Sequence, residues 1–153
     1  MNLKPILDLS QLAVNVTGIV FLGITIWSFR KQMNAQVYLA YTQRYENLMA
    51  GCDDDFRSSL LKLAIGEIDE ARRDRIKVCM LRYLNLCSEE FHLMRSGYLS
   101  KAVWRIWQKE LEGTLRTRLF TSGWPALEDE FGSHSDFRRY VEQVQRTPGR
   151  PAD

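Results

Sequence analysis

The sequence contains few of the residues that interrupt helices. Its 153 residues include only 9 Gly and 4 Pro, and two of the prolines lie within the last six residues. Glycine and proline are the residues that most weaken or end a helix. Their scarcity excludes a fold made of many tight turns and favours a few long helices.

The chain also lacks an excess of charge of either sign. It carries 21 Lys and Arg against 19 Asp and Glu, which gives a formal net charge of +2. A nucleic-acid-binding domain normally has a clear basic excess, and an acidic tail would appear as a run of one sign. Neither is present, so we expect no nucleic acid among the partners.

Residues that build catalytic or metal centres are scarce as well. No Walker loop, GxGxxG, HExxH or GxSxG motif occurs, and the two histidines, His92 and His134, are not at a spacing typical of metal ligands. His92 should lie on the polar side of its helix. We therefore predict no catalytic residue, no cofactor-binding residue, no metal site and no cofactor, and we predict that the chain is not an enzyme.

The three cysteines are too few and too irregular for a disulfide framework. Cys52, Cys79 and Cys87 show no CxxC spacing, and any pairing within the chain leaves one of them over. We expect all three as reduced thiols, which agrees with a cytoplasmic location of the segment that carries them.

What the chain does have is one long uncharged stretch near its start. Residues 9–29 read LSQLAVNVTGIVFLGITIWSF, and no charged residue lies between Asp8 and Arg30. At about 1.5 Å per residue, a helix of this length crosses a hydrocarbon layer about 30 Å thick. A cleaved signal peptide should end in small residues, whereas this run ends in Trp, Ser and Phe followed by two cations. We predict an uncleaved transmembrane helix over 9–29, preceded by a short lead over 1–8.

Cations flank the predicted span unequally. Arg30 and Lys31 follow it, with Arg44 further on, whereas only Lys4 and the α-amino group precede it. An excess of Lys and Arg marks the cytoplasmic side of a membrane protein. We therefore predict a single-pass membrane protein with its N-terminus outside and its C-terminal domain in the cytoplasm.

One polar residue inside the span suggests a further role for it. The carboxamide of Asn15 would need a partner in hydrocarbon, and such side chains can join helices at about 1 kcal/mol or less. Ala13 and Thr17 form a small-xxx-small pair on a neighbouring face. The span could therefore associate with a second copy, and the alternative is that Asn15 lies near enough to the outer interface to reach water.

After the span we predict a helical cytoplasmic domain over 30–146. The transmembrane helix should continue without a break to Ala50, because residues 30–50 contain neither Gly nor Pro. Tyr38, Tyr41 and Tyr45 recur on it at helical spacing. One-sided apolar periodicity is typical of a core-facing helix, so we expect these tyrosines to pack against the rest of the domain, with a partner-binding face as the alternative.

Shorter elements complete the predicted domain. A helix over 54–64 follows the first one, and an amphipathic helix over 136–146, capped by Ser135, closes the chain. The tail over 147–153 is predicted to be disordered.

The strongest tertiary prediction is an antiparallel hairpin of helices 68–96 and 100–120. Gly97 suits the left-handed residue that closes a helix, and Ser100 can cap the next one. The apolar faces of the two helices match level by level, as a hairpin with a short loop requires. The expected contacts are Met94 with Trp104, Phe91 with Trp107, Cys87 with Leu111, Tyr83 or Leu84 with Leu115, and Met80 with Leu119.

Glu90 is the polar residue that stands out in this hairpin. At about 100° per residue it falls inside the apolar arc of its helix, where a carboxylate is costly unless paired. The indole of Trp107 and the charge of Arg44 are the expected partners. We favour a pair that fixes helix register, and the alternative is an active-site carboxylate.

Three segments carry a family resemblance. They are the span running into YLAYTQRY at 38–45, the helical segment YLNLCSEEF at 83–91, and the Gly97-Tyr98-Leu99 turn. In them the chain resembles a family of uncharacterised bacterial single-pass membrane proteins with a small cytoplasmic helical domain. The resemblance covers most of the chain. It implies a fold and a location, but no activity and no functional residue.

Together these observations predict an all-α protein in which an N-terminal transmembrane helix precedes a small helical bundle built on the antiparallel hairpin. The predicted function is a membrane-tethered protein-interaction module, adaptor or sensor-like, whose partners are the lipid bilayer and another protein. The alternative is a self-oligomerising membrane effector that perturbs the bilayer, for which Asn15 would be essential.

Overall fold

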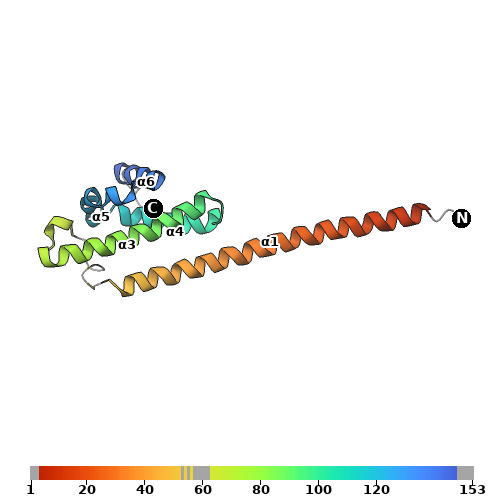
Figure 1. The fold of residues 1–153 in the computed structure, drawn as a ribbon, viewed down its shortest axis with the longest axis horizontal. Helices are drawn as coiled ribbons and strands as arrows, with labels where there is room; N and C mark the ends of the chain where they lie inside the picture. Colours follow the sequence, from red (N-terminus) through yellow and green to blue (C-terminus); the bar gives the residue numbers. More distant parts are fainter. Residues whose placement is uncertain (1–3, 53, 55, 57–62, 148–153) are drawn as a thin grey trace, which may run out of the picture. The chain divides into compact units, whose positions relative to one another are not determined.

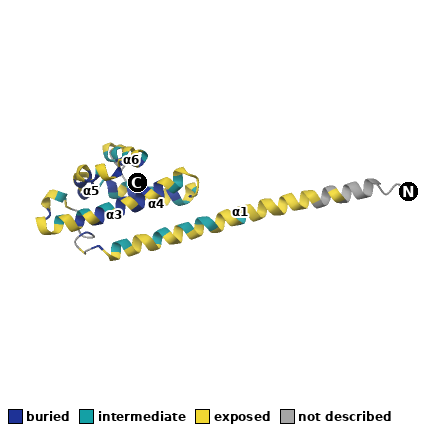
Figure 2. Ribbon diagram, viewed as in Figure 1, coloured by how far each residue is buried: buried dark blue, intermediate teal, exposed yellow. Residues whose placement is uncertain are grey.

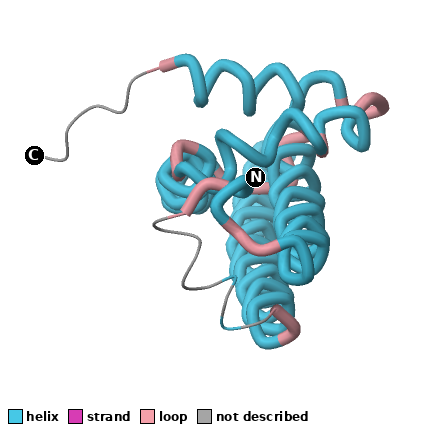
Figure 3. The backbone as a smooth tube through the Cα atoms, turned by 90° about the vertical axis from the view of Figure 1, so that its left-hand side faces the viewer, coloured by secondary structure: helices cyan, strands magenta, loops and turns pink. Residues whose placement is uncertain are grey.

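The computed structural model describes residues 4–52, 54, 56 and 63–147, and within its first helix the side chains of 4–10 and 12–14 are not described. All regular structure in these residues is helical, as the tube in Figure 3 makes plain. The predicted all-α class is therefore confirmed. The elements, labelled in Figure 1, are α1 (Lys4–Ala50), η1 (Ile65–Glu67), α3 (Glu70–Arg95), α4 (Lys101–Leu115), α5 (Arg118–Gly123), η2 (Trp124–Ala126), η3 (Glu128–Phe131) and α6 (Ser135–Arg146).

The chain divides into two compact units, Met1–Val37 and Tyr38–Asp153. The first unit is the N-terminal part of α1, where most described residues are exposed (Figure 2). In the part of the chain that the structure describes, no helix combines the length and the apolar character needed to cross a membrane. This finding gives the predicted span no support.

The second unit contains the predicted hairpin of α3 and α4. Asp69 caps α3 by accepting a hydrogen bond from the Arg72 amide, and Ser100 caps α4 by accepting one from the Val103 amide. Between them Gly97 has φ +75°, a left-handed conformation that other residues rarely adopt. The turn chemistry predicted from Gly97 and Ser100 is confirmed.

The predicted single helix over 100–120 is wrong in its last part. Helix α4 ends at Leu115, and α5 starts at Arg118 after a short turn. Thr117 accounts for the break, because its hydroxyl oxygen accepts a hydrogen bond from the Phe120 amide and so caps a new helix. A threonine that can bond its own backbone competes with helix continuation, and the apolar periodicity does not reveal this competition.

One predicted level of the hairpin also differs. Phe91 packs edge-on against Trp104, with 6.0 Å between ring centroids, instead of against Trp107. Trp107 contacts α1, where its ring stacks on Tyr38 at 5.9 Å and 12°. Pairing the residues of two helices by their numbers leaves out a third helix. Here Trp107, one of the largest side chains of α4, packs against α1 instead of α3.

The core of the second unit is closed by α6 and the short helices before it. Phe137 and Tyr140 of α6 lie 5.8 and 5.0 Å from the Phe91 ring, and Phe131 lies 5.6 Å from the Phe137 ring. The predicted helix over 136–146 is present. It begins one residue earlier, so Ser135 is its first residue and not its cap.

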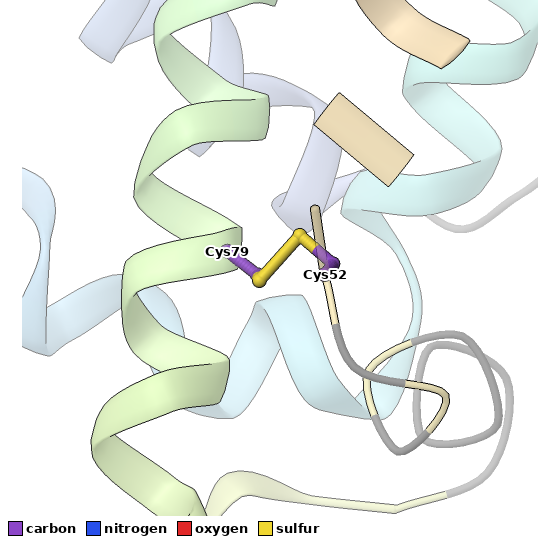
Figure 4. Close-up of a disulfide and its surroundings, with 2 residues drawn as sticks. All are labelled: Cys52 and Cys79. Atoms are coloured by element: carbon purple, nitrogen blue, oxygen red, sulfur yellow. A yellow bond between two sulfur atoms is a disulfide. The ribbon is translucent and has the colours of Figure 1, made fainter. Parts of the chain in front are cut away.

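The cysteines depart from the predicted reduced state. Cys52, directly after α1, forms a disulfide with Cys79 of α3, with 5.9 Å between their Cα atoms (Figure 4). Cys87 is free and buried. The prediction of three thiols failed because it relied on the odd number of cysteines and on local spacing, whereas this pair is brought together by the approach of α1 to α3.

Two predictions fall largely or wholly outside the residues that the structure describes. The helix predicted over 54–64 is described only at Asp54, Phe56, Leu63 and Ala64, and the disordered tail predicted over 147–153 is described only at Thr147.

Candidate functional site

The second unit contains a cavity of about 220 Å³. Three helices supply its walls: the end of α1, the middle of α3 and the middle of α4. The lining residues are Tyr41, Thr42 and Tyr45 from α1, Tyr83, Leu86, Cys87 and Glu90 from α3, and Trp107, Glu110, Leu111 and Thr114 from α4. An engineered apolar cavity of about 150 Å³ holds benzene, so this space suits one small organic molecule.

The tyrosine stripe of α1 forms one wall. Tyr41 lies 5.7 Å from the Trp107 ring, and Tyr45 lies edge-on to Tyr83 at 6.4 Å. The expected packing against the hairpin is thus present. Tyr38 and Tyr45 nevertheless remain 37% and 43% exposed, so the stripe is only partly withdrawn from solvent. Two residues of the stripe, Tyr41 and Tyr45, line the cavity together with Thr42, whereas Tyr38 does not line it.

Glu90 is buried beside this cavity, as its place in the apolar arc predicted. Its residue surface is 8% exposed, and burial raises the pKa of its carboxyl to about 7. The charge of Arg44 pulls this pKa down and that of Glu89 pushes it up, but both effects are smaller than burial. Among the described residues no hydrogen bond or ion pair reaches the Glu90 carboxyl.

The expected partners of Glu90 are therefore corrected. Arg44 binds the neighbouring Glu89 through two hydrogen bonds of 2.5 and 3.1 Å. The Tyr41 hydroxyl donates to the same carboxylate at 3.2 Å. Trp107 shares the cavity with Glu90, but no hydrogen bond between them is present. Consecutive helical positions differ in direction by about 100°, which is why Glu89 faces Arg44 and Glu90 faces the cavity.

The Glu89 carboxylate stays ionised through its partners. The hydrogen bond from Arg44 lowers the pKa of Glu89, and it raises the pKa of Arg44. Sequence reasoning missed Glu89 because it lies at the polar edge of its helix. A signal was present: Arg44 and Glu89 carry opposite charges and lie at the edges of the two apolar stripes that predicted this packing.

Two buried titratable groups of the cavity, Cys87 and Tyr83, are held neutral. Burial raises the pKa of the Cys87 thiol well above its usual value, and the nearby Glu90 charge adds to the effect. Burial likewise raises the pKa of Tyr83. A thiol with a raised pKa is a poor nucleophile. The cavity therefore offers aromatic faces and carboxylates for binding, while its one thiol is not activated.

The histidines behave as the sequence predicts in one respect. His92 is exposed, on the polar side of α3. His92 and His134 both line a second pocket between α3 and α6, together with Asp136. Within the described part of the chain, however, no group of three or more His, Cys, Asp or Glu side chains is placed to hold a metal ion.

The Arg44–Glu89 pair gives a test of this geometry. Their side chains are 50% and 48% exposed, so we expect a coupling of only about 0.5–1 kcal/mol between Arg44→Ala and Glu89→Ala in a double-mutant cycle of unfolding. The coupling should fall at 1 M salt. A cycle of Arg44→Ala with Glu90→Gln serves as the control and should give a smaller coupling. The assignment of Arg44 to Glu89 fails if the two cycles rank the other way.

Comparison with known proteins adds no further constraint. No family model, curated protein or solved structure matches this chain.

Proposed function

We propose that this chain is a membrane-tethered helical module that acts by binding other molecules, in the manner of an adaptor or sensor, and not by catalysis. The observation that carries the proposal is the continuity of α1. One unbroken helix, Lys4–Ala50, contains the uncharged stretch at 9–29 and also supplies Tyr41, Thr42 and Tyr45 to the cavity wall. A molecule bound in the cavity would therefore touch the helix that holds the protein at the bilayer.

The tether is supported by the large apolar side chains that α1 exposes. At about 100° per residue they point in every direction around the helix, and a helix that is apolar all round needs an apolar environment. Residues 9, 10 and 12–14 of the proposed anchor lie outside the side chains that are described. The exposed residues are Val16, Ile19, Val20, Phe21, Leu22, Ile24, Ile26, Trp27 and Phe29.

The flanking cations support a cytoplasmic position of the second unit, with the N-terminus outside. The cytosol keeps thiols reduced. In that compartment the Cys52–Cys79 link would form only on oxidation, so the proposed orientation makes the redox state of this pair a direct test of location. The resemblance to single-pass proteins with a cytoplasmic helical domain is in accord with this orientation.

Membrane attachment can be tested by placing charge in the anchor. An Arg at the centre of a span disfavours insertion by about 2.5–3.5 kcal/mol. We expect Val20→Arg combined with Ile24→Arg to release the full-length chain from sedimented membranes. Ala102→Arg, a charge added at an exposed position of α4, is the control and should leave the chain in the membrane fraction. The tether is refuted if the wild-type chain is recovered without detergent.

The adaptor role and its alternative differ in what Asn15 does. Its side-chain oxygen accepts a hydrogen bond from Gln11 of the same helix at 3.5 Å. We expect affinity purification of the full-length chain from detergent to recover a distinct protein partner, both for the wild type and for Asn15→Leu. Recovery of self-oligomers alone, lost in Asn15→Leu, would instead favour the effector that perturbs the bilayer.

A further inference from the structure

The cavity of the second unit has an unusual balance of charge. Two of its lining residues are glutamates, Glu90 and Glu110, and none of the described lining residues is a lysine, arginine or histidine. Arg44, the nearest cation to act on Glu90, is held by two hydrogen bonds to Glu89. When Glu90 is ionised, its negative charge therefore has no partner of its own.

An unpaired carboxylate in this position is costly. A buried charge is stabilised by a counter-charge or by hydrogen bonds. Glu90 is 8% exposed, no described residue forms a hydrogen bond or an ion pair with it, and the charge of Arg44 offsets only part of the effect of burial. A small cation entering the cavity would supply the missing charge. The empty space beside the carboxyl is large enough for such an ion, at about 220 Å³.

The aromatic side chains of the cavity walls also favour a cationic ligand. Four rings line the cavity, and ring contacts hold all four in place: Tyr41 lies 5.7 Å from Trp107, and Tyr45 lies 6.4 Å from Tyr83, which also contacts Phe120. The faces of Trp and Tyr rings carry partial negative charge and attract ammonium groups within about 6 Å. A metal ion would prefer a set of oxygen ligands, whereas these rings favour an organic cation with an apolar surface.

We propose that this cavity binds a small organic ammonium ion, with its cationic head against Glu90 and its alkyl groups against Tyr41, Tyr45, Tyr83 and Trp107. The inference rests on the proposed function, because it gives the binding module a class of ligand. A protein or lipid that presents the same head group would use the same chemistry.

The charge state of Glu90 makes this binding depend on pH. The neighbouring charged and titratable groups are Glu89 on the same helix and Arg44 and Tyr41 on α1, while Cys87 and Glu110 share the cavity with Glu90. With a pKa of about 7, Glu90 is mostly protonated at pH 6 and mostly ionised at pH 8. Affinity for the cation should therefore rise by up to about tenfold between these pH values, and binding should release a proton.

The test uses choline as the probe and the full-length chain in an uncharged maltoside detergent, with heats of binding measured by calorimetry. The neutral isostere 3,3-dimethylbutan-1-ol has the same shape without the charge. We expect choline to bind at pH 8, to bind about tenfold more weakly at pH 6, and to bind at least tenfold more tightly than the isostere. Glu90→Gln should lose this preference, while Glu130→Gln, at an exposed position outside the cavity, should keep it.

Three results would overturn the inference: no choline binding at pH 8, equal binding of the isostere, or unchanged choline binding by Glu90→Gln. Thermal unfolding followed by circular dichroism shows whether each variant is folded. Sedimentation of the same preparations with membranes tests the tether separately. A chain that stays in the membrane and recovers its protein partner, yet does not bind choline, refutes the ligand class and leaves the proposed function intact.

Discussion

Replacing Glu90 with glutamine is expected to stabilise the chain at pH 8 by about 3 kcal/mol. Burial raises the pKa of Glu90 from its ordinary value of 4.5 to about 7. Each unit of difference between the folded and unfolded pKa corresponds to about 1.4 kcal/mol. Glutamine has the shape of the protonated acid, so it keeps the same packing beside the cavity without the cost of burying an ionised carboxylate.

The direction in which stability changes with pH follows from proton linkage. Between pH 4.5 and 7 the folded chain holds a proton on Glu90 that the unfolded chain has lost, so the free energy of unfolding falls as pH rises through this window. The stability contributed by this group is complete below pH 4.5 and is lost above pH 7. The lowered pKa values of Glu67 and Glu89 act in the opposite sense, below about pH 4.5.

Denaturant unfolding of the two chains at pH 5 and pH 8 measures the effect. The stability of Glu90→Gln and of the wild type should be similar at pH 5 and should separate at pH 8, with the variant the more stable. Glu130→Gln should follow the wild type at both pH values. If Glu90→Gln is instead destabilised at pH 8, the carboxylate has a stabilising partner, and the interpretation of an unpaired charge in the cavity is wrong.

The contrast between Glu90 and Glu89 also marks how far the sequence could predict the site. Burial of Glu90 follows from helical periodicity, which depends only on α3 itself. The partner of Arg44 depends on the angle between α1 and α3, and two adjacent glutamates were both within its reach. Whether Arg44 binds Glu89 or Glu90 decides which of the two carboxylates is left without an ion pair. Helical periodicity does not predict that choice.

Local chemistry predicted the hairpin turn more completely. Gly97 and Ser100 act within a few residues of themselves, through a positive φ and a side-chain cap, so their roles did not depend on distant parts of the chain. Thr117 is also a local signal, but its position inside an apolar repeat concealed it. The periodicity there continues from α4 into α5, because both helices bury side chains in the same core: Leu115, Leu119 and Phe120 are all buried.

The disulfide required information that no local pattern provides. Cys52 and Cys79 are 27 residues apart, and they meet only because the end of α1 lies against α3. Closing a loop of this length in the unfolded chain is expected to stabilise the fold by about 3–4 kcal/mol in the chain-entropy model. For a domain of this size, that corresponds to a change in Tm of roughly 10–15 °C.

Reduction of the Cys52–Cys79 bond should therefore lower the Tm of the chain by this amount. Heating the protein with and without dithiothreitol measures the shift. The combined variant Cys52→Ala and Cys79→Ala should have the lower Tm under both conditions and should not respond to the reductant. Cys87→Ala is the matched control, because it removes the free buried thiol and should keep the full response.

The same bond tests the orientation that we propose for the protein in cells. With the second unit in the cytoplasm, rapid alkylation of thiols in untreated cells should label Cys52 and Cys79, and treatment with an oxidant such as diamide should protect both. The labelling of Cys52→Ala with Cys79→Ala gives the background from Cys87. Full protection in untreated cells would mean that the pair lies in an oxidising compartment. The orientation predicted from the flanking cations would then be reversed. The N-terminus of α1 would lie in the cytoplasm, and the second unit with its cavity would lie on the opposite side of the membrane.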